Sequence, residues 1–89
     1  MQYTWHEPKR RANLKKLGLD FREANEVFAG PTFTFEDDRA DYGEQRWVTI
    51  GLLDKTVVIV VHTETENEIR VISMRKADHD EQILFFTNG

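Results

Sequence analysis

Residues 47–74, WVTIGLLDKTVVIVVHTETENEIRVISM, decide the fold of this chain. Three runs within it, at residues 47–50, 56–63 and 68–74, are rich in β-branched and aromatic side chains, which is typical of strands. The connections between the runs are short and polar, which favours antiparallel hairpins over crossovers. Phe33 and Phe35 alternate with threonines and indicate one more strand before them. We therefore expect a meander of three or four antiparallel strands.

Two helical signals precede these strands. Residues 8–17 begin with a proline that suits a first helical position and are followed by Gly18, which suits a C-terminal cap. Asp20 and Glu23 are spaced as a capping box in front of a helical pattern over residues 21–29. The sequence therefore predicts two helices ahead of the sheet.

The segments outside these elements complete the expected fold. Residues 37–45 are acidic and contain glycine, so we expect a loop, whereas residues 78–86 can form a short closing helix. The fold class expected is α+β: two N-terminal helices, a three- to four-stranded antiparallel sheet with helices covering one face, and a short C-terminal helix. We expect residues 1–89 to form a single domain, because a chain of this length falls within the size of one domain.

The composition is that of a small soluble globular protein, with 39% hydrophobic and 31% charged residues. There is no cysteine, which excludes disulfides and thiolate metal sites and fits a reducing cytosol. The start of the chain lacks the apolar core of a secretory signal, and no apolar run approaches the ~20 residues of a membrane span. We therefore expect a cytoplasmic protein without membrane contact.

The charge is unevenly distributed. The net charge of −4 argues against nucleic-acid binding through overall charge, since phosphate neutralisation supplies much of such affinity. Residues 1–22, however, carry six basic and two acidic groups, a net +4, which leaves −8 for the remainder. A basic end on an acidic body is compatible with RNA contact, and the alternative is a solvated helix face.

Residues in and between the expected elements form a pattern that covers nearly the whole chain. The most specific block is residues 70–77, RVISMRKA, with Glu81 after it. The other matching positions are Trp5, Glu7, Lys9, Asn13, Lys16, Gly18, Phe21, Ala24, Val27, Phe28, Glu44, Arg46, Gly51 and residues 60–63. This pattern resembles the BrnT family of type II toxins, whose fold is like that of RelE ribonucleases. The resemblance implies a metal-independent endoribonuclease that inhibits translation. It also implies neutralisation by a BrnA-like ribbon-helix-helix antitoxin, through which alone operator DNA would be bound.

Arg70 and Arg75 are candidate catalytic residues. RNA is cleaved without a metal ion when a ribose 2′-hydroxyl attacks its own phosphate, which requires stabilisation of extra negative charge. Arginine suits this task because its permanent charge can hold two phosphate oxygens at once. Strand alternation puts the two on opposite faces, so they converge only if the chain bends near residue 74. The alternative is that one of them forms a structural ion pair with an acidic residue such as Glu81.

His62 is the third candidate catalytic residue, because it is the only histidine within a predicted strand and imidazole titrates in a useful pH range. A two-residue turn at residues 65–66 would place His62 opposite Ile69 and near Arg75. The alternative is a structural histidine.

Lys9, Lys16 and Arg46 are candidate substrate-binding residues that could contact phosphates, although surface lysines on a helix are commonly only solvated. No Gly-rich phosphate loop follows a strand, and the three histidines lack the spacing of a zinc motif. We therefore expect neither a metal nor a nucleotide cofactor.

Three departures from the family pattern leave other functions open. His6 stands where an aspartate is common, Leu17 where a histidine is common, and no tyrosine is found among the aromatics of residues 84–86. With the negative net charge, they motivate the alternative of a catalytically degenerate protein-interaction domain of the same fold. A further alternative is a direct nucleic-acid regulator without nuclease activity.

Overall fold

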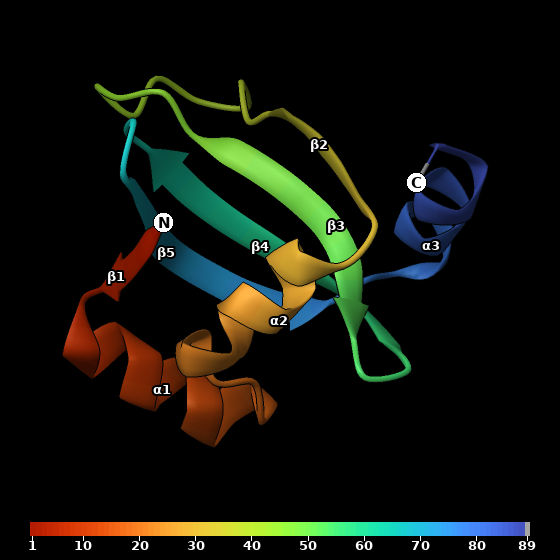
Figure 1. Ribbon diagram of the computed structural model, residues 1–89, viewed down its shortest axis with the longest axis horizontal. Coiled ribbons are helices and arrows are strands. Elements are labelled where there is room, and N and C mark those ends of the chain that lie inside the picture. The colour runs from red at the N-terminus through yellow and green to blue at the C-terminus, as the bar shows by residue number, and fades with distance from the viewer. Residues whose placement is uncertain (89) are drawn as a thin grey trace.

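The computed structural model describes residues 1–88 and contains one five-stranded mixed sheet with helices packed against it (Figure 1). The sheet order is β1-β5-β4-β3-β2. In chain order the elements are β1 (Gln2–Trp5), α1 (Glu7–Leu17), the 3-10 turn η1 (Phe21–Glu23), α2 (Ala24–Ala29), β2 (Thr32–Glu36), β3 (Trp47–Leu53), β4 (Thr56–Glu64), β5 (Glu68–Lys76) and α3 (His79–Asn88).

The N-terminal segment corrects the expected fold. Strand β1 precedes the helices and pairs in parallel with the start of β5, from Gln2 opposite Glu68 to Trp5 opposite Val71. The prediction of two N-terminal helices and a three- to four-stranded antiparallel sheet was therefore wrong. The antiparallel pairs are β2–β3, β3–β4 and β4–β5. The parallel pair joins segments more than 60 residues apart, a contact that no local pattern specifies.

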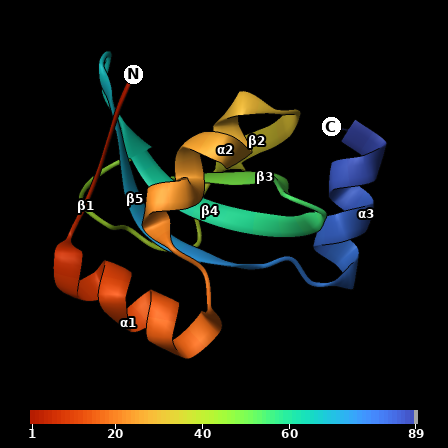
Figure 2. The same cartoon turned by 60° about the horizontal axis from the view of Figure 1, so that its bottom comes forward.

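The helices lie on both faces of the sheet, so the expectation that they cover one face was also wrong. The α1–α2 face carries one core cluster of Leu19, Phe21, Ala24, Val27, Leu53, Val58, Val60, Val71 and Met74. The α3 face carries a second cluster of Val48, Ile50, Val57, Ile59, Val61, Ala77 and Phe85. Figure 2 shows α3 set apart from α1 and α2. The central strand, β4, is buried on both faces, which explains the continuous apolar run at Val57–Val61.

Strand β5 contains a bulge that changes which side chains share a face. Val61 pairs with Ser73, but the next residue of β4, His62, pairs with Val71, so Ile72 is the extra residue. Val71 and Met74 consequently both point into the α1–α2 cluster although they are three positions apart.

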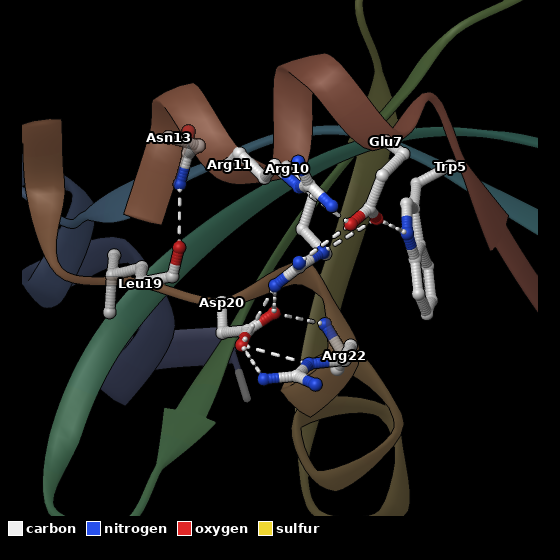
Figure 3. A network of polar contacts seen from close by, with 8 residues as sticks. All are labelled: Trp5, Glu7, Arg10, Arg11, Asn13, Leu19, Asp20 and Arg22. Carbon is white, nitrogen blue, oxygen red and sulfur yellow. Dashed lines mark hydrogen bonds and ion pairs between the residues drawn. The ribbon is translucent and has the colours of Figure 1, made fainter. Parts of the chain in front are cut away.

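None of the residues of helix α1 is buried, and polar contacts join the helix to β1 and to the start of η1. Arg10 donates to Glu7 at 2.7 Å and to Asp20 at 3.2 Å, and Trp5 Nε1 donates to Glu7 at 3.0 Å (Figure 3). The Arg10 guanidinium, with the other donors, lowers the pKa of Glu7 to about 2. Asp20 caps η1 through the Arg22 amide at 3.0 Å. The Glu23 amide donates to the Asp20 carbonyl at 3.0 Å, but the Glu23 side chain makes no hydrogen bond back to the Asp20 amide within residues 1–88, so the predicted capping box is only half present.

Asn13 fastens the far end of α1. Its Nδ2 donates to the Leu19 carbonyl at 2.9 Å, and its Oδ1 accepts a long 3.5 Å bond from the Met74 amide. β1 pairs with β5 only as far as Val71, so this amide lies on the open edge of the sheet. Within residues 1–88, no helix is both long and apolar enough to cross a membrane.

Candidate functional site

A hollow of about 260 Å³ opens on the α3 face, between α3 and the loop that joins β2 to β3. We call it the Arg75 hollow. Its apolar floor comes from Phe35, Val48, Ile59 and Val61, and its polar lining is Glu36, Asp37, Asp38, Arg39, Ser73, Arg75 and Glu81. Five elements and one loop therefore contribute to one open depression that contains two guanidinium groups.

Arg75 is positioned by Glu81 at the start of α3. Its two terminal nitrogens, Nη1 and Nη2, each donate to a Glu81 carboxylate oxygen at 2.7 Å. Glu81 also accepts from the Asp78 amide at 2.9 Å, while Asp78 accepts from the Glu81 amide at 2.8 Å. This reciprocal capping box fixes Glu81, and Glu81 in turn fixes Arg75. The ion pair anticipated between an arginine and Glu81 is thus present.

The same pair sets the electrostatics of the hollow. The hydrogen bonds between the two groups raise the pKa of Arg75 and lower the pKa of Glu81, so both groups stay charged at neutral pH. The Arg75 side chain remains 43% exposed. Arg75 lines the hollow, and its Nε makes no hydrogen bond to any of residues 1–88, so the Nε–Nη2 edge of the guanidinium keeps unused donors.

Arg39, which the sequence analysis missed, provides the second guanidinium. It lies in the β2–β3 loop, and its Nε and Nη2 donate to Asp37 at 2.7 Å and 2.8 Å. The one sequence signal for it is the Asp-x-Arg spacing, which recurs at Asp20 and Arg22 with the same bonding pattern. An aspartate at a turn accepts from the backbone two residues on, and that geometry also brings the arginine to it.

Arg70 lies on the same face as Arg75. In an antiparallel pair opposed residues share a face; Arg70 opposes Thr63, and Arg75 opposes Ile59. The bulge at Ile72 produces this arrangement, where a bend near residue 74 had been expected. Arg70 is exposed and does not line the Arg75 hollow. Five residues of strand, about 15 Å, separate the backbone positions of Arg70 and Arg75.

His62 lies on the opposite face, so its expected proximity to Arg75 was wrong. The turn lies one residue later than anticipated, at residues 66–67, and places His62 opposite Val71 instead of Ile69. That shift alone would keep His62 on the same face, and it is the bulge at Ile72 that turns Arg75 to the other face of the sheet. The ring is fully buried, with its Nε2 2.7 Å from Thr49 Oγ1 and its plane edge-on to Phe28 at 5.0 Å. Burial lowers the pKa of His62 to about 4. The imidazole is therefore neutral at physiological pH and shielded from solvent.

Lys9 and Lys16 line a shallow groove between α1 and β5, the α1 groove. Its lining is Lys9, Ala12, Asn13, Lys16, Leu17, Phe21, Ile72 and Ser73. Ser73 lines both this groove and the Arg75 hollow. The groove that contains the two lysines therefore meets the hollow that contains Arg75 at Ser73, next to the β5 bulge.

Arg46 is engaged in holding the β2–β3 loop. Its guanidinium carbon stacks 4.0 Å above the Tyr42 ring, its Nε lies 3.6 Å from a Glu44 oxygen, and its carbonyl accepts from the Asp37 amide at 2.8 Å. It does not line the Arg75 hollow. Among residues 1–88 no three acidic or histidine side chains come together as a metal-binding group.

These observations define a small α+β protein whose mixed sheet presents carboxylate-held arginines on one open face. The family model described as "Ribonuclease toxin, BrnT, of type II toxin-antitoxin system" matches residues 5–81. The chain therefore belongs to the BrnT family of ribonuclease toxins, and the resemblance drawn from its sequence is confirmed. A toxin of this type implies an antitoxin partner.

A solved structure agrees with this assignment. The chain is similar to the crystal structure of the Brucella abortus ribonuclease toxin BrnT, with a TM-score of 0.71 and 33% sequence identity. The match covers 89% of this chain and 99% of that chain. A comparison with curated proteins gave no significant match. The fold described above is thus shared with that toxin over nearly its whole length.

Proposed function

We propose that this protein is a metal-independent endoribonuclease that inhibits translation, with its reaction centre in the Arg75 hollow. The observation that carries the proposal is Arg75 itself. In a chain of a ribonuclease toxin family, it is a permanently charged group, fixed by Glu81 and still 43% exposed in an open depression. A pre-positioned cation of this kind stabilises developing phosphate charge without reorganising during the reaction.

The proposed reaction uses the substrate's own nucleophile. The ribose 2′-oxygen forms a bond to the adjacent phosphorus and the bond to the 5′-oxygen breaks. A 2′,3′-cyclic phosphate is left, and the 2′-proton is transferred to the departing oxygen. The free Nε–Nη2 edge of Arg75 would hold two non-bridging oxygens as their charge increases. His62 is left out of this chemistry because it is buried on the other face.

We propose that the RNA strand runs from the α1 groove over Ser73 into the Arg75 hollow. Lys9 and Lys16 would contact phosphates in the groove, since both line it and it meets the hollow at Ser73. Arg70, exposed on the same face as Arg75, would contact the strand further along β5. Arg46 would act indirectly by holding the β2–β3 loop.

We further propose that the antitoxin is BrnA-like, with a ribbon-helix-helix part that binds operator DNA, and that the toxin acts in the cytoplasm. DNA contact would then belong to the partner. The net charge of −4 supports this division, because an acidic toxin is a poor DNA ligand by itself.

The test is tightly induced expression in a bacterial host, comparing wild type with Arg75→Ala and with the Arg70→Ala/Arg75→Ala double variant. We expect growth arrest and loss of intact RNA with wild type only. Removing one charge-stabilising donor typically costs about 10²–10³ in kcat. Arg22→Ala is the matched control, because Arg22 is also exposed and carboxylate-bound but belongs to η1, away from the Arg75 hollow.

Cleavage of RNA by purified wild-type protein should persist in excess EDTA if no metal takes part. Equal arrest by wild type and by soluble Arg75→Ala protein would remove Arg75 from the mechanism, and loss of cleavage in EDTA would contradict metal independence.

A second candidate is a catalytically degenerate protein-interaction domain. The observation that favours it is the lining of the Arg75 hollow, where four carboxylates, of Glu36, Asp37, Asp38 and Glu81, accompany two guanidiniums. Such a lining suits a basic peptide. Normal growth of a host that contains soluble wild-type protein and no antitoxin would favour this candidate over the nuclease.

A further inference from the structure

The β2–β3 loop is organised around the carboxylate of Asp37. The Asp37 side chain is only 1% exposed, yet it is charged, because the Arg39 hydrogen bonds lower its pKa to about 2. Tyr42 Oη donates to it at 3.3 Å, and its amide donates to the Arg46 carbonyl at 2.8 Å. A buried carboxylate held at this many points is a fixed anchor for whatever it binds.

What Asp37 binds is the inner edge of Arg39, and the outer part of that guanidinium is left to solvent. Nε and Nη2 are engaged, whereas Nη1 makes no hydrogen bond within residues 1–88. The Arg39 side chain is 68% exposed and lines the Arg75 hollow with Arg75 and Ser73. It is close enough to Arg75 for the like charge to act against the Arg75 pKa, although the Glu81 hydrogen bonds outweigh it.

The arrangement places two arginines at one depression, each fixed by a carboxylate on one edge and each with unused donors on another. Two such cations repel each other when the hollow is empty, and an anion between them removes that repulsion. A phosphodiester is an anion that arginine binds through two oxygens at once.

We propose that Arg39 is a second phosphate-binding residue of the RNA site and that Asp37 is its positioning residue. This inference rests on the proposed ribonuclease function and extends it from β5 to the β2–β3 loop. Arg39 would contact the reacting phosphate or its neighbour from the side of the Arg75 hollow opposite α3.

The chain contains its own control for Arg39. Arg22 is bound to Asp20 through the same two nitrogens, at 3.0 Å and 2.8 Å, and it is 65% exposed, but it belongs to η1, on the α1–α2 face (Figure 3). Removing either arginine subtracts one equally exposed, ion-paired charge. Only the removal of Arg39 should affect a ligand in the Arg75 hollow.

The experiment compares purified wild type, Arg39→Gln, Arg39→Lys and Arg22→Gln. The binding probe is a single-stranded RNA of mixed sequence with every 2′-oxygen methylated, so that it binds but cannot be cleaved. We expect Arg39→Gln to weaken binding about tenfold and to reduce the salt dependence of log K by about 0.7, the value for one lost phosphate contact. The RNA affinity of Arg39→Lys should lie between those of wild type and Arg39→Gln, because lysine retains the charge but not the paired donors. Arg22→Gln should match wild type.

Thermal unfolding checks that each variant folds. If Arg39→Gln leaves Asp37 too poorly paired to fold, the Asp37→Asn/Arg39→Gln double variant takes its place, since it removes both charges together. RNA binding by Arg39→Gln equal to that of Arg22→Gln overturns the inference. So does a defect in antitoxin binding without one in RNA binding, because the surface would then serve a protein partner.

Failure of the proposed function gives a different result. Cleavage of unmodified RNA by wild type and by Arg75→Gln tests the nuclease itself. Absence of cleavage by wild type would refute the nuclease whatever the Arg39 variants do. Normal cleavage by wild type, lost in Arg75→Gln but unchanged in Arg39→Gln, would leave the nuclease intact and overturn only the role of Arg39.

Discussion

Arginine–carboxylate pairs dominate the polar chemistry of this chain, and their value is positional. Arg22, Arg39 and Arg75 each bind a less exposed carboxylate through two nitrogens. Pairs with an exposed partner contribute roughly 0–1 kcal/mol to stability, so they do little to hold the fold together. What they fix is the direction in which a cation points. At Arg39 and Arg75 that direction is the Arg75 hollow.

His62 predicts a pH-dependent stability at the residue scale. Its pKa is about 4 in the folded protein against about 6.5 when unfolded. Between these values the unfolded chain binds the proton and the folded chain does not, so the free energy of unfolding falls as pH falls from 6.5 to 4. The maximal loss is on the order of 3 kcal/mol. Urea unfolding at several pH values in this window measures it.

The matched variant is His62→Gln, which cannot titrate but can still bond to Thr49. The pH dependence of wild type should exceed that of His62→Gln over this window, whatever the baseline stability of the variant. The Glu64 carboxylate lies 3.4 Å from His62 Nδ1, and its negative charge favours the protonated form of the ring. Glu64→Gln should therefore steepen the loss. Parallel curves for wild type and His62→Gln would refute the assignment.

The candidate site was partly predictable at this scale. Arg75 and its partner Glu81 could be recognised from residue types and spacing. The role of Arg39 could not, because it depends on a loop folded around a buried aspartate that reads in the sequence as one of several acidic loop residues. His62 was misplaced relative to Arg75 because the bulge at Ile72, which turns Arg75 to the other face of the sheet, has no local signal in the sequence.

At the element scale, the docking of α2 on β3 depends on Gly51. A Cβ at this position would lie 2.7 Å from Val27 Cγ1 and 3.2 Å from Thr32 Cγ2. Gly51→Ala should therefore force α2 and the start of β2 away from the sheet and cost about 1–3 kcal/mol of stability. Chemical denaturation measures the loss.

Gly30→Ala is the control for this substitution. Gly30 has a negative φ of −106°, and no atom lies within 4 Å of its ideal Cβ. Its replacement should change stability by less than about 1 kcal/mol. Equal effects of the two substitutions would show that α2 does not pack on β3 as closely as described.

The elements themselves were more predictable than their arrangement. The runs of β-branched residues in β3, β4 and β5 and the caps of α1 are local signals. The parallel pairing of β1 and the side of the sheet taken by α3 are not local, since both depend on contacts across most of the chain. The β5 bulge is similar: Arg70-Val71-Ile72-Ser73 reads as a regular strand, and only packing of both Val71 and Met74 into one core reveals the extra residue.

At the scale of the whole molecule, the topology determines where the basic residues lie relative to one another. The basic residues of the first 22 positions lie mainly on α1, which packs against β5. Strand β5 in turn carries Arg70 and Arg75. The topology thus places the α1 lysines and the β5 arginines on the two faces of one strand, and four carboxylates also line the Arg75 hollow. A net charge of −4 is therefore compatible with a local path for RNA.

The size of the molecule leads to a prediction about its antitoxin. A chain of 89 residues buries a smaller share of its unfolded surface than a larger domain does, and its stability is correspondingly modest. A partner that binds only the folded state adds about 2.7 kcal/mol when present at 100 times its Kd. For a domain of this size, 1 kcal/mol shifts Tm by roughly 4–8 °C, so the proposed BrnA-like antitoxin should raise Tm by about 10–20 °C. Thermal unfolding of the toxin, followed with and without that partner, measures the shift.

An unrelated ribbon-helix-helix protein at the same concentration should leave Tm unchanged. An unshifted Tm with saturating antitoxin would mean that the proposed partner does not bind the folded toxin.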